Sequence, residues 1–193
     1  MRIPLVQAII LQAGFVLGLN DFTTRTKDAI GIYKNPKINP FLQLDLSVDF
    51  PANVSTPDGP TALVPNREGG KVSGAFEADI LPVGAAYERV VVNEAGENSF
   101  YNNRYIFRTA DNETLSFEVD VILNYANNAL HGFGVGKFAT SVPRFLNLNY
   151  NVYIVEVSAN FFEGEGKGQV YEIKSGGRRD GKPIKALIPL EDE

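Results

Sequence analysis

The side chains best suited to proton transfer or anion binding in this chain are one histidine and two arginines. His131 is the only histidine, and histidine is the residue type that exchanges protons most readily near neutral pH. Arg104 and Arg108 carry planar guanidinium groups, which hold a carbonyl or an anion through paired N–H donors. We therefore take His131, Arg104 and Arg108 as candidate catalytic residues, with a solvated surface position as the alternative for each.

Aromatic side chains around these arginines are candidates for lining a binding site. A phenol can lie along an apolar wall and still form one hydrogen bond, which suits a small-molecule site. The candidate ligand-binding residues are Tyr87, Tyr101, Tyr105, Phe107, Phe117 and Tyr125. The alternative is that they pack together as an ordinary core.

Composition removes several classes of chemistry. The chain has 193 residues, no cysteine and a single histidine, so disulfides, a thiolate nucleophile and cysteine or multi-histidine metal sites are excluded. We expect no cofactor and no metal. The formal net charge is -5 and the longest basic run is Arg178-Arg179, so the basic surface of a nucleic-acid-binding protein is missing.

The elements that position these residues have the pattern of short β-strands. Residues 42–50 alternate apolar and polar side chains without exception, a period of two that a half-buried strand satisfies. Further strands are expected at residues 71–76, 77–81, 87–93, 100–109, 114–123, 148–158 and 168–174. About eight short strands with no helical periodicity between them predict one all-β antiparallel domain, either a barrel or a β-sandwich.

One hairpin can be assigned down to its register. A two-residue turn would set arginines opposite the apolar stripe of the following strand, which is unfavourable. A three-residue loop at residues 110–112, with Asn112 left-handed, instead pairs the aromatic residues with one another. It places Tyr105 beside Phe117 and Phe107 beside Leu115, and it sets Arg104 opposite Glu118.

Two longer stretches are expected to be connections rather than strands. Residues 51–65 contain a Thr-Pro-Asp-Gly-Pro run that is typical of turns. Residues 124–147 are long, glycine-bearing and aromatic, as a lid over a pocket would be, and they contain His131. A mobile surface connection is the alternative for this second stretch.

The N-terminal segment is typical of a secretory signal peptide. Arg2 precedes a largely apolar run that ends near residue 19, and small residues suit cleavage after Gly18. Sequons at Asn53 and Asn112 fit a secreted glycoprotein. We expect a signal peptide at residues 1–18, a linker at 19–40, a β-barrel domain at 41–174 and a C-terminal tail at 175–193, with no membrane span in the mature form. The alternative is a cytoplasmic protein in which residues 3–19 belong to the fold.

A series of short segments follows one another in a recognisable order. They are the strand at 41–50, Arg-Glu-Gly-Gly-Lys-Val-Ser-Gly at 67–74, Ile-Leu-Pro-Val-Gly at 80–84, Asn-Arg-Tyr-Ile-Phe-Arg-Thr-Ala-Asp-Asn at 103–112 and Pro-Arg-Phe at 143–145. In this order the chain resembles the domain of unknown function 3237 family, also called uncharacterised protein family 0311. The resemblance implies a calycin-like β-barrel, and such barrels commonly enclose small apolar ligands at the barrel mouth.

The chain departs from the family pattern after Pro82. The family typically has two glycines, a spacer, then an aspartate and a tryptophan. Here Val83 replaces the first glycine, and Ala86-Tyr87 stand in place of the acid and the indole. If that aspartate is the family's functional acid, the resemblance implies that this chain has lost it.

Three functions fit these observations. The first is a cofactor-independent isomerase or cyclase that acts on a small, largely apolar or aromatic metabolite, of the kind that tailors natural products. The second is a secreted carrier that binds such a ligand unchanged, and the third is a structural module with a packed interior. The first two require a cavity at the barrel mouth, lined by Tyr and Phe with an Arg or His at its rim. Exposed strand edges are compatible with a homodimer.

Overall fold

The computed structural model describes residues 31–57, 59–94, 96–127, 129–160 and 164–185. The expected signal peptide at residues 1–18 lies outside the described residues, as does most of the expected linker. Within the described ranges, no helix has the length and apolar character needed to cross a membrane.

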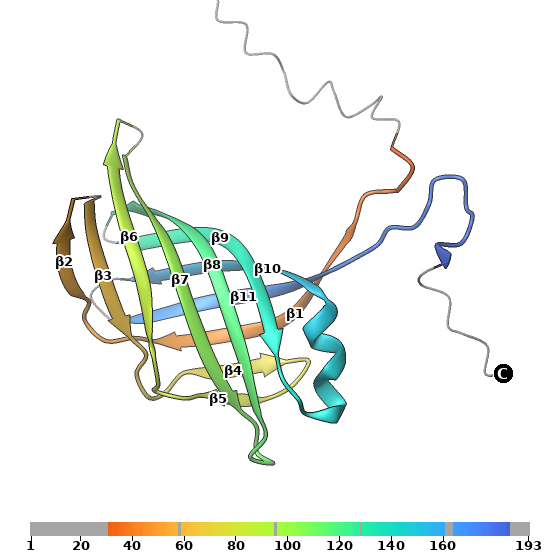
Figure 1. The fold of residues 1–193 in the computed structure, drawn as a ribbon, viewed down its shortest axis with the longest axis horizontal. Coiled ribbons are helices and arrows are strands. Elements are labelled where there is room, and N and C mark those ends of the chain that lie inside the picture. The colour runs from red at the N-terminus through yellow and green to blue at the C-terminus, as the bar shows by residue number, and fades with distance from the viewer. Residues whose placement is uncertain (1–30, 58, 95, 128, 161–163, 186–193) are drawn as a thin grey trace, which may run out of the picture. The chain divides into compact units, whose positions relative to one another are not determined.

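Eleven strands in the described part of the chain form one antiparallel sheet (Figure 1). In chain order they are β1 (Lys37–Ser47), β2 (Ala52–Thr56), β3 (Gly59–Pro65), β4 (Lys71–Gly74), β5 (Ala78–Ile80), β6 (Ala85–Asn93), β7 (Gly96–Arg108), β8 (Thr114–Ala126), β9 (Ala129–Ala139), β10 (Val152–Asn160) and β11 (Glu165–Lys174). A short 3-10 helix, η2 (Pro143–Tyr150), connects β9 to β10.

The sheet closes into a ring. β7 pairs with β8 from Glu97↔Tyr125 to Arg108↔Thr114, and its C-terminal end also pairs with β5. The ring therefore runs from β7 through β8, β9, β10, β11, β1, β4 and β5 back to β7. The predicted all-β antiparallel barrel is confirmed, and the alternative sandwich is not formed.

A three-stranded branch leaves this ring at β7. β6 pairs with the N-terminal half of β7, between Tyr87↔Asn102 and Asn93↔Gly96. β3 then pairs with β6, and β2 pairs with β3. The end of β3 also contacts the segment that follows β1, since the Asp49 amide donates a hydrogen bond to the Pro65 carbonyl. The branch therefore extends the barrel wall at one end, the end that lies away from η2 in Figure 1.

The predicted β7–β8 register is confirmed. Tyr105 pairs with Phe117, Phe107 with Leu115, and Arg104 with Glu118. Asn112 has a φ of 59°, and the Thr109 amide donates to the Glu113 carbonyl, so residues 110–112 form the three-residue loop. A slip by one residue would turn the apolar face of one of the two strands outward, which explains why a pattern argument is sufficient here.

The first strand differs from its predicted bounds. β1 begins at Lys37 and ends at Ser47, so residues 37–40 belong to the barrel rather than to the linker. Phe50, which the alternation predicted to face the interior, is 80% exposed. The chain turns away from the β1–β11 ladder after Ser47, which pairs with Glu165 as the last residue of that ladder.

The expectation of a connection at residues 51–65 is wrong, because this stretch forms the β2–β3 hairpin. At its turn Thr56 pairs with Gly59, whose φ of 113° is a conformation that glycine adopts without strain. Four of the five residues of β2 are exposed. The strand therefore lacks the apolar alternation by which half-buried strands are recognised.

The expected lid at residues 124–147 is also wrong. Its middle forms β9, which pairs with β8 on one side and β10 on the other, and its two ends belong to β8 and η2. Three of its inward positions are glycines, Gly132, Gly134 and Gly136, so the usual alternation is hidden. A side chain at Gly136 would collide with Phe117, because an added Cβ would lie 2.5 Å from the phenylalanine ring.

Aromatic side chains pack the end of the barrel that η2 covers, here called the closed end. Its aromatic residues are Phe41, Phe76, Phe107, Phe117, Phe138, Phe145 and Tyr153. Phe138 is central, with its ring centroid 4.4 Å from that of Phe117 and 5.0 Å from that of Tyr153. η2 contributes Phe145, whose ring centroid lies 5.0 Å from that of Phe76. Burying such rings against one another supplies both apolar area and favourable ring contacts.

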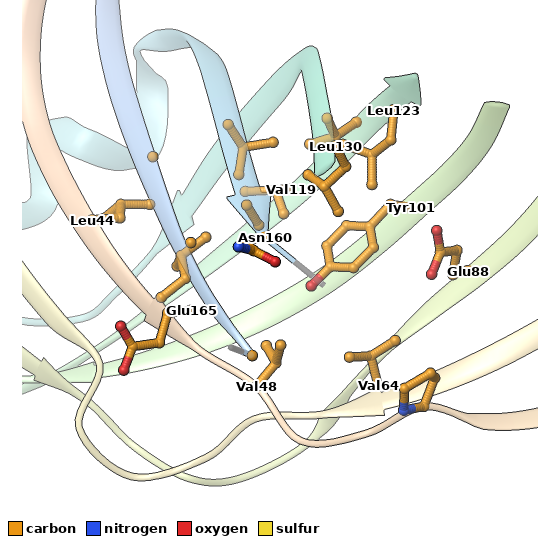
Figure 2. Close-up of a pocket in the computed structure, with 18 of the residues that line it drawn as sticks. Leu44, Val48, Val64, Glu88, Tyr101, Val119, Leu123, Leu130, Asn160 and Glu165 are labelled. Carbon is orange, nitrogen blue, oxygen red and sulfur yellow. The ribbon is translucent and has the colours of Figure 1, made fainter. Parts of the chain in front are cut away.

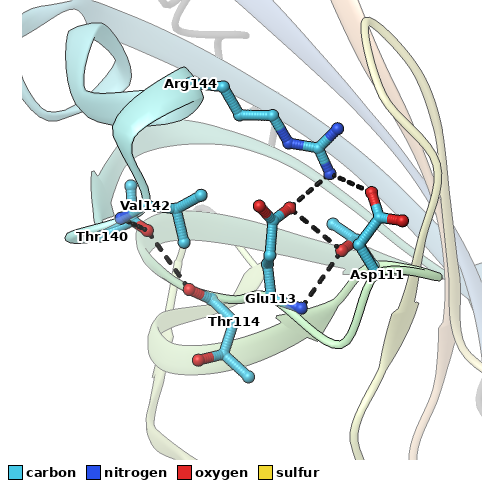
Figure 3. A network of polar contacts seen from close by, with 7 residues as sticks. Asp111, Glu113, Thr114, Thr140, Val142 and Arg144 are labelled. Atoms are coloured by element: carbon cyan, nitrogen blue, oxygen red, sulfur yellow. Dashed lines mark hydrogen bonds and ion pairs between the residues drawn. The ribbon is translucent and has the colours of Figure 1, made fainter.

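Exposed polar contacts fasten η2 to the β7–β8 hairpin (Figure 3). The Arg144 guanidinium donates to Asp111 Oδ2 at 2.8 Å and also to Glu113. Thr140, just before η2, donates its hydroxyl hydrogen to the Thr114 carbonyl at 3.2 Å. Because ion pairs in contact with water stabilise little, these contacts orient η2 more than they hold the fold together.

Candidate functional site

A cavity of about 210 Å³ lies at the opposite end of the barrel, here called the open end. Apolar side chains from the ring and the branch form most of its wall (Figure 2). They are Leu44, Leu46, Val48, Val64, Val119, Val121, Leu123, Leu130, Val155 and Val157. A concave, mainly apolar site with a few polar groups is the usual form of a small-molecule site.

Strand periodicity places these residues inside. Along β8, Leu115, Phe117, Val119, Val121 and Leu123 are all buried and alternate with more exposed positions. The first two belong to the closed end, whereas the last three line the cavity. One strand therefore serves both ends of the barrel through the same inward face.

Glu88 is a buried acid in the cavity wall. It points inward from β6 and is 8% exposed, and Figure 2 shows its carboxyl on the same side of the cavity as Tyr101. The Tyr125 hydroxyl donates to Glu88 Oε1, and Ser99 Oγ lies 3.2 Å from the Tyr125 hydroxyl oxygen. Burial raises the pKa of Glu88 above its ordinary value, a hydrogen bond with Ser99 opposes this, and the Glu97 carboxylate adds to it.

Two more phenols line the cavity together. The hydroxyl oxygens of Tyr101 and Tyr105 are 3.4 Å apart, and Asn103 Nδ2 donates to the Tyr101 oxygen at 3.1 Å. Burial raises the pKa of Tyr101 well above its ordinary value, and burial also raises the pKa of Tyr105. Both phenols therefore keep their protons at neutral pH and can donate hydrogen bonds.

A buried amide pair supports Tyr101 from behind. Asn103 is 1% exposed and donates from Nδ2 to Asn66 Oδ1 at 2.9 Å. Asn66 in turn donates from Nδ2 to the Val83 carbonyl at 2.8 Å. Because buried amides need partners, this chain of hydrogen bonds fixes the position of the Tyr101 hydroxyl relative to the barrel wall.

The charged residues at the mouth are exposed. Asp49, Arg67 and Glu165 line the outer part of the cavity, and Arg67 donates from Nε to Ser47 Oγ at 3.0 Å. With tyrosines, Phe50 and an arginine in its lining, the cavity expected at the barrel mouth is present. Among the described residues, no group of three or more His, Cys, Asp or Glu side chains is arranged to hold a metal ion.

Half of the predicted ligand-binding residues meet at the cavity. Tyr101, Tyr105 and Tyr125 line it. Phe107 and Phe117 are fully buried at the closed end instead. Tyr87 is 50% exposed, because it lies between the inward residues Ala86 and Glu88 on β6 and so points outward.

The three residues predicted as catalytic all lie on the outer surface. His131 Nε2 is 2.9 Å from Glu156 Oε1, and Arg104 donates to Glu118 at 2.5 Å. Arg108 is exposed at the end of β7, where it lies opposite Asp79 in the β5–β7 register. Each of the three occupies an outward position of its strand, and their chemical type alone carried no information on that orientation.

Sequence reasoning did not identify Glu88, although a signal for it exists. The resemblance implies an acid at the place of Ala86, and a strand has a period of two, so residue 88 faces the same way as residue 86. Both are buried, with Ala86 at 0% and Glu88 at 8% exposure. An acid is thus present on the inward face of β6, two residues beyond the position that the resemblance indicated. Ser99 and Asn103 gave no comparable signal.

The profile of the family described as "Protein of unknown function (DUF3237)" matches residues 36–147. The chain belongs to this family. No curated protein matches the chain.

Solved structures with the same fold come from bacteria and a fungus. A protein of unknown function from Clostridium acetobutylicum ATCC 824 superposes with a TM-score of 0.62 at 20% identity, over 72% of this chain and 100% of that one. A β-barrel-like protein from Acinetobacter baumannii AYE gives 0.61 at 15% identity, over 73% and 98%. An enzyme from Penicillium herquei gives 0.52 at 15% identity, over 73% and 96%. At such identities the likeness shows the barrel fold.

Proposed function

We propose that this barrel is a cofactor-independent isomerase or cyclase that moves a proton within a small, largely apolar metabolite bound at the open end. The observation that carries the proposal is the Glu88 carboxyl, which faces an apolar cavity and accepts a hydrogen bond from Tyr125. A carboxyl in this position is the kind of group that removes and returns protons in proton-transfer enzymes.

The raised pKa of Glu88 supports an acid–base role. Burial is the main cause of the shift, and it brings the acid closer to neutral pH, where a group can both accept and donate a proton. In the reaction, a substrate C–H or O–H bond breaks and its proton passes to Glu88. The carboxyl exchanges this hydrogen with solvent and then donates a proton at another position, so substrate and product are isomers and no electron acceptor is needed.

The cavity supplies the rest of what such a reaction needs. Its apolar wall excludes water from the reacting atoms and holds the substrate in one orientation. The phenols of Tyr101 and Tyr105 offer hydrogen bonds without changing charge themselves. One barrel of the same fold is described as an enzyme, which is compatible with catalysis by this one.

The test begins with the protein purified from its native source, whose bound small molecule is released by denaturation and identified by mass spectrometry. That compound is then incubated in D₂O with wild type and with Glu88→Gln. We expect an isomer that carries deuterium, formed at least about 100-fold more slowly by the variant, since general acid–base catalysis contributes on that scale.

A matched control keeps the test specific. Glu156→Gln removes an acid from the outer surface, where Glu156 pairs with His131, and should leave the rate unchanged. If the compound is recovered unaltered and without deuterium, catalysis is rejected and the protein is a carrier for that ligand. If Glu88→Gln reacts as fast as wild type, the role of Glu88 is rejected.

Secretion is a separate part of the proposal. It rests on residues 1–18, outside the described ranges, and on the sequons at Asn53 and Asn112, both of which lie at exposed positions. The intact mass of the native protein tests it: a mature chain that begins at Leu19 supports secretion, and a chain that retains Met1 contradicts it.

A further inference from the structure

The hydroxyl hydrogens of Tyr101 and Tyr105 outnumber the acceptors that the described residues offer them. The Val83 carbonyl accepts from Asn66 at 2.8 Å, which identifies the nitrogen of the Asn66 amide. Asn66 Oδ1 is then the acceptor for Asn103 Nδ2 at 2.9 Å. The second N–H of Asn103 is left for the Tyr101 oxygen at 3.1 Å.

Because Tyr101 accepts from Asn103, its own hydrogen must be donated elsewhere. Within the described residues, the acceptor in reach is the Tyr105 oxygen at 3.4 Å. If Tyr101 donates to Tyr105, the hydrogen of Tyr105 remains; if Tyr105 donates, the hydrogen of Tyr101 remains. In both arrangements the pair presents one unused O–H donor, and both residues line the cavity.

The charges around this donor disfavour an anionic ligand. Among the described residues that line the cavity, Arg67 is the one with a positive charge, and it is exposed at the mouth. The ionisable group in the interior is Glu88, whose carboxylate adds a small contribution to the effect of burial in raising the pKa of Tyr101. A ligand carboxylate or phosphate would be desolvated beside an acid without a compensating cation, which costs free energy.

We infer that the cavity binds a neutral carbonyl compound whose oxygen accepts the unused hydrogen of the Tyr101–Tyr105 pair, while the apolar wall holds its hydrocarbon part. This inference rests on the proposed function for its site and names the substrate class. When Glu88 removes a proton from the carbon next to the carbonyl, the bonding electrons move onto the carbonyl oxygen. The phenol that holds this oxygen stabilises the negative charge that develops there.

The donor count makes an unusual prediction for substitutions. Tyr101→Phe leaves the Tyr105 hydrogen free, and Tyr105→Phe leaves the Tyr101 hydrogen free, so each single variant retains one donor. The double variant retains none. With 1-indanone as the probe, we expect each single variant to bind within about twofold of wild type and the double variant about fivefold to tenfold more weakly, the effect of one hydrogen bond.

Indane, the same ring system without the oxygen, is the matched probe, and NMR titration of the full chain measures both affinities. Indane should bind wild type and the double variant equally. Tyr87→Phe removes an exposed phenol from the outer face and should change neither affinity. The carbonyl stretching frequency of bound 1-indanone, read by infrared difference spectroscopy, should be lowered by wild type and by both single variants but not by the double variant.

Three outcomes overturn the inference: equal loss of indane and indanone affinity in the double variant, an unshifted carbonyl band in wild type, or tighter binding of indane-1-carboxylate or 1-aminoindane than of 1-indanone. The failure of the proposed function is separate, because it is read from deuterium uptake with Glu88→Gln. If the protein binds ketones as described but exchanges no protons, the inference about the ligand stands and the proposed catalysis is rejected.

Discussion

The two ends of the barrel are built from the same strands and hold different interiors. At the closed end, aromatic rings fill the space, as in the contact of Phe138 with Phe117. At the open end, aliphatic side chains surround a cavity of about 210 Å³, and the buried side chains of Glu88 and Tyr105 contribute polar groups to its wall. The strands alternate in the same way at both ends, so side-chain size, not backbone geometry, decides which end is packed.

The difference in polarity follows the same division. Around the closed end, charges such as Arg144 and Glu113 stay on the surface, in contact with water. At the open end Glu88 is buried, and burial raises its pKa. Burial disfavours the charged form of an acid, so Glu88 costs folding free energy at neutral pH that an exposed acid does not.

Replacing the central ring of the closed end should have the largest effect on stability. Phe138→Ala removes a 5%-exposed ring that contacts Phe117 and Tyr153. We expect the free energy of unfolding to fall by about 4 kcal/mol, the usual cost of deleting a buried phenylalanine ring. Urea denaturation measures it, and a loss below about 2 kcal/mol would show that the closed end is loosely packed.

A matched pair on β8 compares the two ends directly. Leu115 and Leu123 are 1% and 2% exposed, but only Leu123 lines the cavity. Leu115→Ala should cost about 3 kcal/mol, and Leu123→Ala about 1–2 kcal/mol, because a side chain that faces empty space has fewer contacts to lose. Equal losses in urea denaturation would mean that the cavity is filled in solution.

Glu88→Gln should change the pH dependence of the free energy of unfolding, through an acid that is buried at the open end. A carboxyl whose pKa is raised on folding contributes its stability below the pKa of the unfolded chain, and loses that contribution as the pH rises through the folded pKa. The variant should therefore match wild type at low pH and exceed it by roughly 1–2 kcal/mol at pH 8. Chemical denaturation across this pH range measures the difference. A difference that is constant with pH would contradict the shift.

The smallest effect concerns two turns, one at each end. Asn112 and Asn127 have φ values of 59° and 53°, and alanine tolerates that region less well than asparagine. Asn112→Ala and Asn127→Ala should each cost about 1 kcal/mol in thermal or urea unfolding, with no difference between the ends, because the strain is local. Asn112→Gly and Asn127→Gly, which remove it, are the controls.

Prediction from the sequence was successful where the signal is local. The β7–β8 hairpin was assigned to its register because a slip would expose Tyr105 and Phe107. β9 was missed because glycines occupy its inward positions. A Cβ at Gly136 would collide with the Phe117 ring, and one at Gly132 or Gly134 would collide with the β8 backbone. No local sequence pattern records these long-range requirements.

The candidate site shows the same limit. Tyr101, Tyr105 and Tyr125 were chosen for their residue type and do meet at the cavity. His131, Arg104 and Arg108 were chosen on the same ground and lie outside. Residue type indicates what a side chain can do, whereas the direction in which it points depends on which face of each strand the barrel encloses.

The sequence by itself determined that this is an all-β antiparallel domain with no cysteine chemistry and an aromatic hairpin in a defined register, because composition, turn residues and period-two alternation are local properties. These patterns fitted a barrel or a sandwich, and the pairing of β7 with both β8 and β5 decided for the barrel. Only the tertiary structure decided that Glu88 is buried beside Tyr125, and that Asn66 and Asn103 hold Tyr101. Those contacts join residues up to 37 positions apart, and burial arises only when the closing ring brings such strands around one volume.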